Sequence, residues 1–205
     1  MQTAATILLA AILAVAMGLF ALMGLLRRRR TGALARQAHQ GGMRFDAADP
    51  FDMPRRCAAF ELIRSGHSPL ARNVAHGRTA GATVRVFDFL HEQGHGTQRL
   101  ARRYAAVVVE LPAPLPEAFL WHAEDEPWPL PAASGGVRRE AWIAVGEPSS
   151  VNRAVAACGE FAGRGLSVEV RGDRVLACAP DRAASGRSLT LDEAGRLAAA
   201  FVPQA

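Results

Sequence analysis

Lysine is absent from this sequence, and every basic residue is an arginine. A P-loop needs a lysine amine to contact nucleotide phosphates, and Schiff-base catalysis needs the same amine as its nucleophile, so both chemistries are excluded. Cysteine is scarce. Cys57, Cys158 and Cys178 lie too far apart for a zinc ribbon or a C-x-x-C redox pair, and an odd number does not close a disulfide framework. We expect buried, reduced thiols, and the sequence indicates no cofactor.

No acidic residue occurs before Asp46. The high pI of the chain, about 10.3, must therefore be interpreted by where along the sequence the charges lie. The chain has 24 basic and 19 acidic residues, which gives a formal net charge of +5. The arginines at positions 27–30 and 36 account for the whole excess, so the chain from Gln37 onward is neutral. A nucleic-acid-binding domain needs a basic patch of its own. The composition therefore argues against a nucleic-acid partner.

Charged side chains are also missing from Thr3 to Leu26, the longest apolar stretch of the chain. As a helix it would be about 36 Å long, which exceeds the bilayer core of about 30 Å. Arg27, Arg28, Arg29 and Arg30 follow directly. Basic residues on the C-terminal side of a span face the cytoplasm. Residues 1–30 are thus predicted to be a single-pass anchor in the inner (plasma) membrane, with the N-terminus outside and the following domain cytoplasmic.

A cleaved signal peptide ending near Ala16 is the alternative interpretation of this stretch. No basic residue precedes the apolar run, and the basic block follows it, which disfavours cleavage. Ala10, Ala14 and Gly18 place small residues on one helix face, a spacing that permits a homo-oligomer through the transmembrane helix. The arginine block favours anionic headgroups, so the lipid bilayer is an expected partner.

The rest of the chain predicts an α+β domain of mostly antiparallel strands, with two helices in its C-terminal half. We expect a linker at 31–54 and the domain at 55–205. Both faces of Thr83 to His91 are apolar, which predicts a central strand, and Thr97 to Leu111 is its expected hairpin partner. Pro112, Pro114 and Pro116 are expected to end regular structure.

The two helices are predicted from their capping residues. Ser149 or Ser150 can begin a helix that runs to Ala162. Thr190 begins the last helix, and Glu193 stands three residues later, as a capping box requires.

The sharpest motif is His91-Glu92-Gln93-Gly94-His95, which matches the H-E-x-x-H pattern of zinc peptidases. That chemistry needs a helix, which places both histidines on one metal and lets the glutamate activate a bound water. Here a β-branched, aromatic strand leads into His91 and glycines flank His95, so we expect a hairpin tip instead. A zinc hydrolase with His91 and His95 as ligands and Glu92 as base is the alternative function.

Trp121 and Trp128 lie in the segment 121–131, which also contains an acidic run and three prolines. Exposed tryptophans anchor interfaces, so this segment could dock a protein partner. The other interpretation is an ordered loop whose tryptophans pack onto the sheet.

The chain resembles a loose group of bacterial single-span membrane proteins of unknown function. The likeness lies in the turn Gly77 to Gly81, the strand Val84 to Phe89, and the pairs Leu111-Pro112 and Leu115-Pro116. It implies a bacterial inner-membrane protein and carries no activity to transfer. We therefore expect a binding or scaffold domain with an unidentified protein partner, and a non-enzyme rather than an enzyme.

Overall fold

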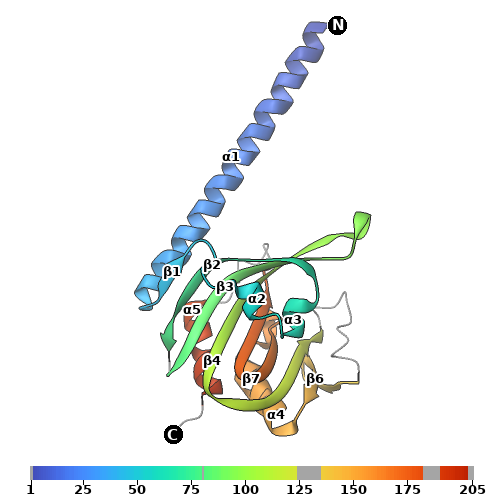
Figure 1. The fold of residues 1–205 in the computed structure, drawn as a ribbon. Helices are drawn as coiled ribbons and strands as arrows, with labels where there is room; N and C mark the ends of the chain where they lie inside the picture. The colour runs from blue at the N-terminus through green and yellow to red at the C-terminus, as the bar shows by residue number, and fades with distance from the viewer. Residues whose placement is uncertain (1, 80, 124–134, 182–189, 203–205) are drawn as a thin grey trace.

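The strand expected to be central, residues 83–91, lies inside an antiparallel sheet in the computed structural model (Figure 1). The structure describes residues 2–79, 81–123, 135–181 and 190–202. The strands are β1 (Arg44–Asp46), β2 (His67–Thr79), β3 (Ala82–Gln93), β4 (Leu100–His122), β5 (Val137–Arg139), β6 (Trp142–Gly146) and β7 (Ser167–Pro180). The helices are α1 (Gln2–Gln40), α2 (Met53–Arg56), α3 (Glu61–Arg64), α4 (Pro148–Cys158) and α5 (Leu191–Phe201), with the 3₁₀ segments η1 (Gly96–Gln98) and η4 (Gly159–Arg164). The predicted α+β class with antiparallel pairing is confirmed.

The sheet is organised around β4, whose neighbours are β3, β6 and β7. Its first part pairs with β3 in the expected hairpin, from Gln93↔Leu100 to Thr83↔Glu110. Its last part pairs with β6, and β7 pairs along both parts. The strand order is β1-β2-β3-β4-β6-β5, with β7 joined to β4 outside this path.

The prolines do not end β4 as predicted, because the strand continues through them to His122. Its register with β7 shifts between Glu110 and Leu115 and again between Leu115 and Ala118. The segment 111–117 is therefore an irregular bend where few ladder hydrogen bonds are required. Proline is tolerated at such a position because it has no N–H to donate.

Alternate residues of β3 face two apolar clusters, one on each side of the sheet. Val84 and Val86 lie in the cluster that α4, α5 and the end of α1 cover. Phe87 and Phe89 lie in the other, with residues of α2 and α3. Figure 1 shows α2 and α3 on the near side of the strands, and α5 behind them. Both faces of the central strands are thus buried.

The N-terminal cap of α5 is the predicted one, whereas that of α4 is Glu147 and not a serine. Thr190 and Glu193 form the predicted capping box, with the Glu193 N–H donating to Thr190 Oγ1 at 3.2 Å. In α4 the cap is Glu147, whose carboxylate accepts from the Ser150 N–H at 3.1 Å. α4 ends at Cys158 because residues 159–164 tighten into η4.

Helix α1 is a continuous helix of 39 residues that projects from the domain (Figure 1). Its large apolar side chains from Ile12 to Leu25 are between 47% and 76% exposed. The helix does not stop at Arg27–Arg30. It continues to Gln40, and its last turns pack against β1 and β2.

Among the residues that the structure describes, no helix has both the length and the apolar character needed to cross a membrane. This finding contradicts the predicted membrane span. It equally contradicts the single-pass topology and the bacterial inner-membrane location with a cytoplasmic domain that were inferred from it.

Candidate functional site

The H-E-x-x-H segment lies at the end of β3 and not on a helix. His91, Glu92 and Gln93 are the last residues of the strand, and Gly94 begins the following turn with φ of +75°. Strand geometry places successive side chains on opposite faces of the sheet. His91 and His95 are therefore not one helical turn apart, which the zinc-peptidase arrangement requires.

His91 is 1% exposed and packs between aromatic rings. Its ring contacts Phe89 at a centroid distance of 5.2 Å and Tyr104 at 5.6 Å, both edge to face. Neither ring nitrogen has a hydrogen-bond partner among the described residues. Burial lowers the pKa of His91 from 6.5 to about 4, and the positive charges of Arg102 and His67 act in the same direction. The side chain is thus a neutral, aromatic member of the core.

Glu92 and His95 belong to a different cluster, on the hairpin that β3 and β4 form. Glu92 is paired with Arg99 and lies 3.7 Å from His67 Nδ1. The hydrogen bond from Arg99 holds the pKa of Glu92 below its ordinary 4.5. His95 stacks on His67 at a centroid distance of 5.1 Å. Within the described ranges, no group of three or more His, Cys, Asp or Glu side chains is arranged to hold a metal ion.

The remaining residues singled out from the sequence do not converge on one site. Trp121 is 5% exposed and stacks on Phe119 at 6.4 Å, so in this structure it offers no exposed indole to a partner. Trp128 lies outside the described residues. Arg27 to Arg30 all lie within α1, and Arg28 and Arg29 are exposed.

The β1-β2-β3 edge of the sheet brings together a basic row that sequence reasoning missed. Arg44 of β1 pairs in register with His76 of β2, and His76 pairs with Arg85 of β3. Residues opposite one another on neighbouring strands project from the same face, with Cβ atoms about 5 Å apart. Only the strand register could reveal this row, because its members are far apart in the sequence.

Phe51 covers the row from the loop after β1. Its ring meets the His76 ring edge to face at 4.8 Å, and the Arg85 guanidinium lies 4.9 Å from its centroid. The Asp49 carboxylate accepts hydrogen bonds from the backbone N–H of Phe51 at 3.0 Å and of Met53 at 2.6 Å. Met53 is completely buried. The loop that carries Phe51 is therefore fixed at two points.

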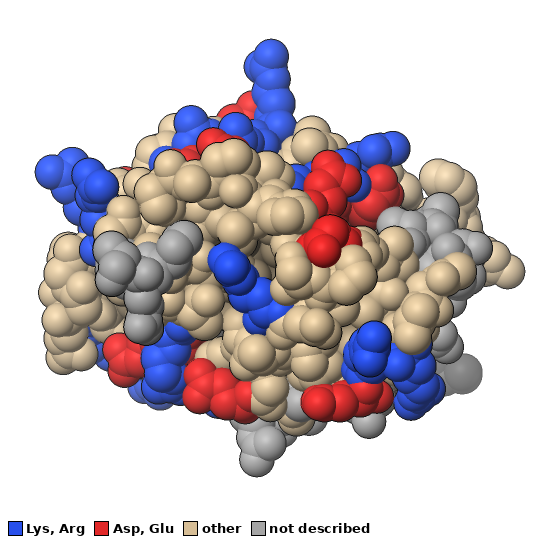
Figure 2. Space-filling model, turned by 90° about the horizontal axis from the view of Figure 1, so that it is seen from below, with Lys and Arg blue, Asp and Glu red and all other residues tan. Residues whose placement is uncertain are grey.

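Phe51 and the basic row line an open groove of about 340 Å³, called the Phe51 groove below. Its lining residues are Gly42, Arg44, Phe51, His76, Gly77, Arg78, Thr83 and Arg85. None of them is acidic. On the face of the molecule seen from below in Figure 2, by contrast, acidic and basic groups are interspersed among uncharged residues. The single sign of charge in the groove is thus a local feature.

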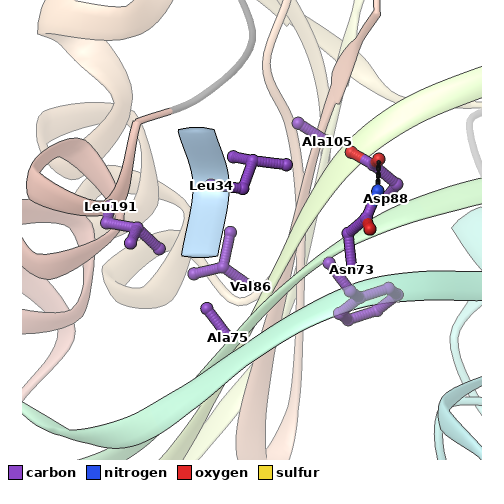
Figure 3. A pocket seen from close by; sticks show the side chains of 8 residues that line it. Leu34, Asn73, Ala75, Val86, Asp88, Ala105 and Leu191 are labelled. Carbon is purple, nitrogen blue, oxygen red and sulfur yellow. Dashed lines mark hydrogen bonds between the residues drawn. The ribbon is translucent and has the colours of Figure 1, made fainter. Parts of the chain in front are cut away.

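A second, much smaller cavity of about 20 Å³ lies where α1 meets the sheet (Figure 3). Leu34 of α1, Leu191 of α5 and Val86 of β3 supply apolar walls. At its polar end Asn73 donates to Asp88 at 2.7 Å, and the Thr31 hydroxyl bonds Asn73 Oδ1 at 3.1 Å. This volume holds at most about one water molecule. The cavity lies at the contact between α1 and the sheet and is too small for an organic ligand.

No protein-family model matches the chain, and no curated protein matches it significantly. Among solved structures, the chain is similar to the crystal structure of the mycobacterial trehalose monomycolate transport factor A, TtfA. The likeness has a TM-score of 0.52 and 14% sequence identity, and it covers 85% of this chain and 98% of TtfA. At this identity it shows a shared fold and nothing about activity.

Proposed function

We propose that this chain is a binding or scaffold domain that serves as an accessory factor in a transport process. The observation that carries the proposal is the likeness to TtfA, which extends over 98% of that chain. A protein described as a transport factor thus consists almost wholly of the fold found here. The partner is expected to be another protein of the same transport process.

The side chains that could have supported the hydrolase alternative instead stabilise the fold. His91 is enclosed by Phe89 and Tyr104, and Glu92 is engaged by Arg99. A general base works best with a pKa near the operating pH, whereas that of Glu92 is held low. These contacts favour a domain that binds over one that catalyses hydrolysis.

The test compares the wild-type full chain with a Glu92→Gln variant, which lacks the carboxylate that a hydrolase would need. Both are tagged and crosslinked in the cells that produce them, and the crosslinked proteins are identified by mass spectrometry. The same two purified chains are assayed with zinc on peptide and ester substrates. A binding domain gives the same defined partner with both chains and no turnover. Zinc-dependent hydrolysis that the variant loses would overturn the proposal, as would the absence of any specific partner.

A further inference from the structure

The Phe51 groove collects positive charge that the fold does not neutralise. Arg85 is paired with Glu110 at 2.6 Å and His76 with Asp46 at 3.1 Å. Arg44 and Arg78, by contrast, have no carboxylate partner among the described residues, and both are exposed. Arg44 and Arg78 therefore leave two positive charges in a groove whose lining has no acidic residue, and an anion bound there would be attracted by both.

From this arrangement we infer that the Phe51 groove is an oxyanion-binding site, which accepts a phosphate or sulfate group. Arginine is suited to this task because its planar guanidinium donates two parallel hydrogen bonds to a pair of oxygens. Arg44, Arg78 and Arg85 come from three different strands, so they can approach one tetrahedral group from three directions.

Arg85 supplies an observation independent of the charge count. The residue is 8% exposed, and its Nε has no acceptor among the described residues although Nη1 is bonded to Glu110. Buried arginine donors are normally satisfied, and leaving one unpaired costs about 1 to 3 kcal/mol. A buried, unpaired N–H donor in the lining of a groove that has no acidic residue suits an anionic acceptor.

Phe51 indicates how much of a ligand the groove can hold. At about 340 Å³ the groove exceeds the size of one phosphate group, and the Phe51 ring forms an apolar wall beside the arginines. Gly42 has no atom within 4 Å of the place where a Cβ would stand, so that side is open. Free inorganic phosphate fits the charge, and a phosphate ester on a small organic group would also use the aromatic wall. The site does not depend on the scaffold proposal, because a domain of either function could contain it.

The experiment is calorimetric titration of the full chain with inorganic phosphate and with phenyl phosphate, at constant ionic strength maintained by chloride. The test variant is Arg44→Gln/Arg78→Gln, which removes two exposed charges without touching an ion pair. The matched control is Arg138→Gln/Arg139→Gln, which removes two exposed arginines of β5. Circular dichroism melts check that each variant is folded, and the single variants Arg44→Gln and Arg78→Gln replace the double variant if it is not.

We expect saturable binding of one anion per chain and a loss of affinity of at least about tenfold in the test variant, with the control unchanged. Each charge-assisted hydrogen bond contributes enough for roughly a tenfold effect. Tighter binding of phenyl phosphate, weakened by Phe51→Leu, would assign the site to phosphate esters, and equal affinities would assign it to the free anion. The inference is overturned if the folded wild type binds neither anion, or if the test variant binds as well as the control.

Discussion

At the residue scale, the buried polar groups His91 and Glu169 are held by contacts within the fold. His91 is enclosed by aromatic rings, and Glu169, which is 2% exposed, accepts from the backbone N–H of Leu62 at 3.2 Å and pairs with Arg171. Through the bond to Leu62, Glu169 connects β7 to α3, which lies 107 residues away in the sequence. Substitution should therefore change stability more than any activity.

His91 should make the stability of the domain sensitive to acid. Its pKa in the folded chain is about 4, below the ordinary 6.5, so the unfolded chain takes up the proton more readily. The stability that neutral His91 contributes is therefore fully present above pH 6.5 and is lost as the pH falls toward 4. Between pH 7 and pH 4.5 we expect a loss of roughly 2 kcal/mol from this residue.

The measurement is the free energy of urea unfolding at both pH values for wild type, His91→Phe and the control His95→Gln, whose histidine is exposed. The phenylalanine variant should lose about 2 kcal/mol less than wild type on acidification. The same pH dependence in all three chains would rule out His91 as its source.

Removal of the Glu169 carboxylate should lower the stability of the domain, because this buried group binds the backbone of α3. Glu169→Ala leaves the buried Leu62 N–H without its acceptor and Arg171 with only the more distant Glu61 as a carboxylate partner, and we expect a loss of about 2 to 4 kcal/mol in unfolding free energy. Glu160 provides the control, because its ion pair with Arg196 is exposed on both sides. Glu160→Ala should cost less than about 1 kcal/mol by chemical denaturation. Similar losses in both variants would contradict this role for Glu169.

At the scale of the elements, local signals predicted what local interactions determine. The alternation of Thr83 to His91 and the capping box at Thr190 and Glu193 are short-range patterns, and the structure confirms both the strand and the cap. The passage of β4 through its prolines was not predictable. It depends on register shifts against β7, a strand more than fifty residues away in the sequence.

The last turns of α1 lie in the segment predicted to be a linker, and they pack against β1 and β2. Ala38 is completely buried, and the Thr31 hydroxyl donates to Asn73 Oδ1 at 3.1 Å. A chain that begins at Thr31 should therefore unfold with the same free energy as the full chain. A chain that begins at Met43 loses the buried contacts of Leu34 and Ala38, and should be less stable by roughly 2 kcal/mol.

Urea denaturation of the two shortened chains checks this expectation, with circular dichroism as the probe of the sheet. Thr31→Ala in the longer of the two separates the hydrogen bond from the apolar contacts, and should cost about 1 kcal/mol. Equal stability of the two shortened chains would mean that the end of α1 contributes nothing to the domain.

At the scale of the whole molecule, the Phe51 groove shows the limit of reasoning from sequence. The arithmetic of charge correctly finds the chain from Gln37 onward to be neutral, and on that ground the sequence argues against a nucleic-acid partner. A net charge of zero over this part of the chain does not exclude a local cluster of positive side chains. Arg44, His76 and Arg85 become neighbours only through the registers of three strands, which no periodicity in the sequence encodes.

The exposed apolar side chains of α1 determine how the whole molecule should behave in water. Side chains from Ile12 to Leu25 are between 47% and 76% exposed, and a contiguous apolar surface of this kind promotes association. Without detergent, the full chain should form oligomers whose mass rises with concentration, whereas the chain that begins at Thr31 should stay monomeric. Sedimentation equilibrium measures both.

Leu19→Glu/Met23→Glu places two charges one helical turn apart on α1 and should shift the full chain toward monomer, because like charges at this spacing repel and would have to be buried on association. A full chain that stays monomeric over the whole concentration range would mean that the apolar surface of α1 is covered within a single molecule.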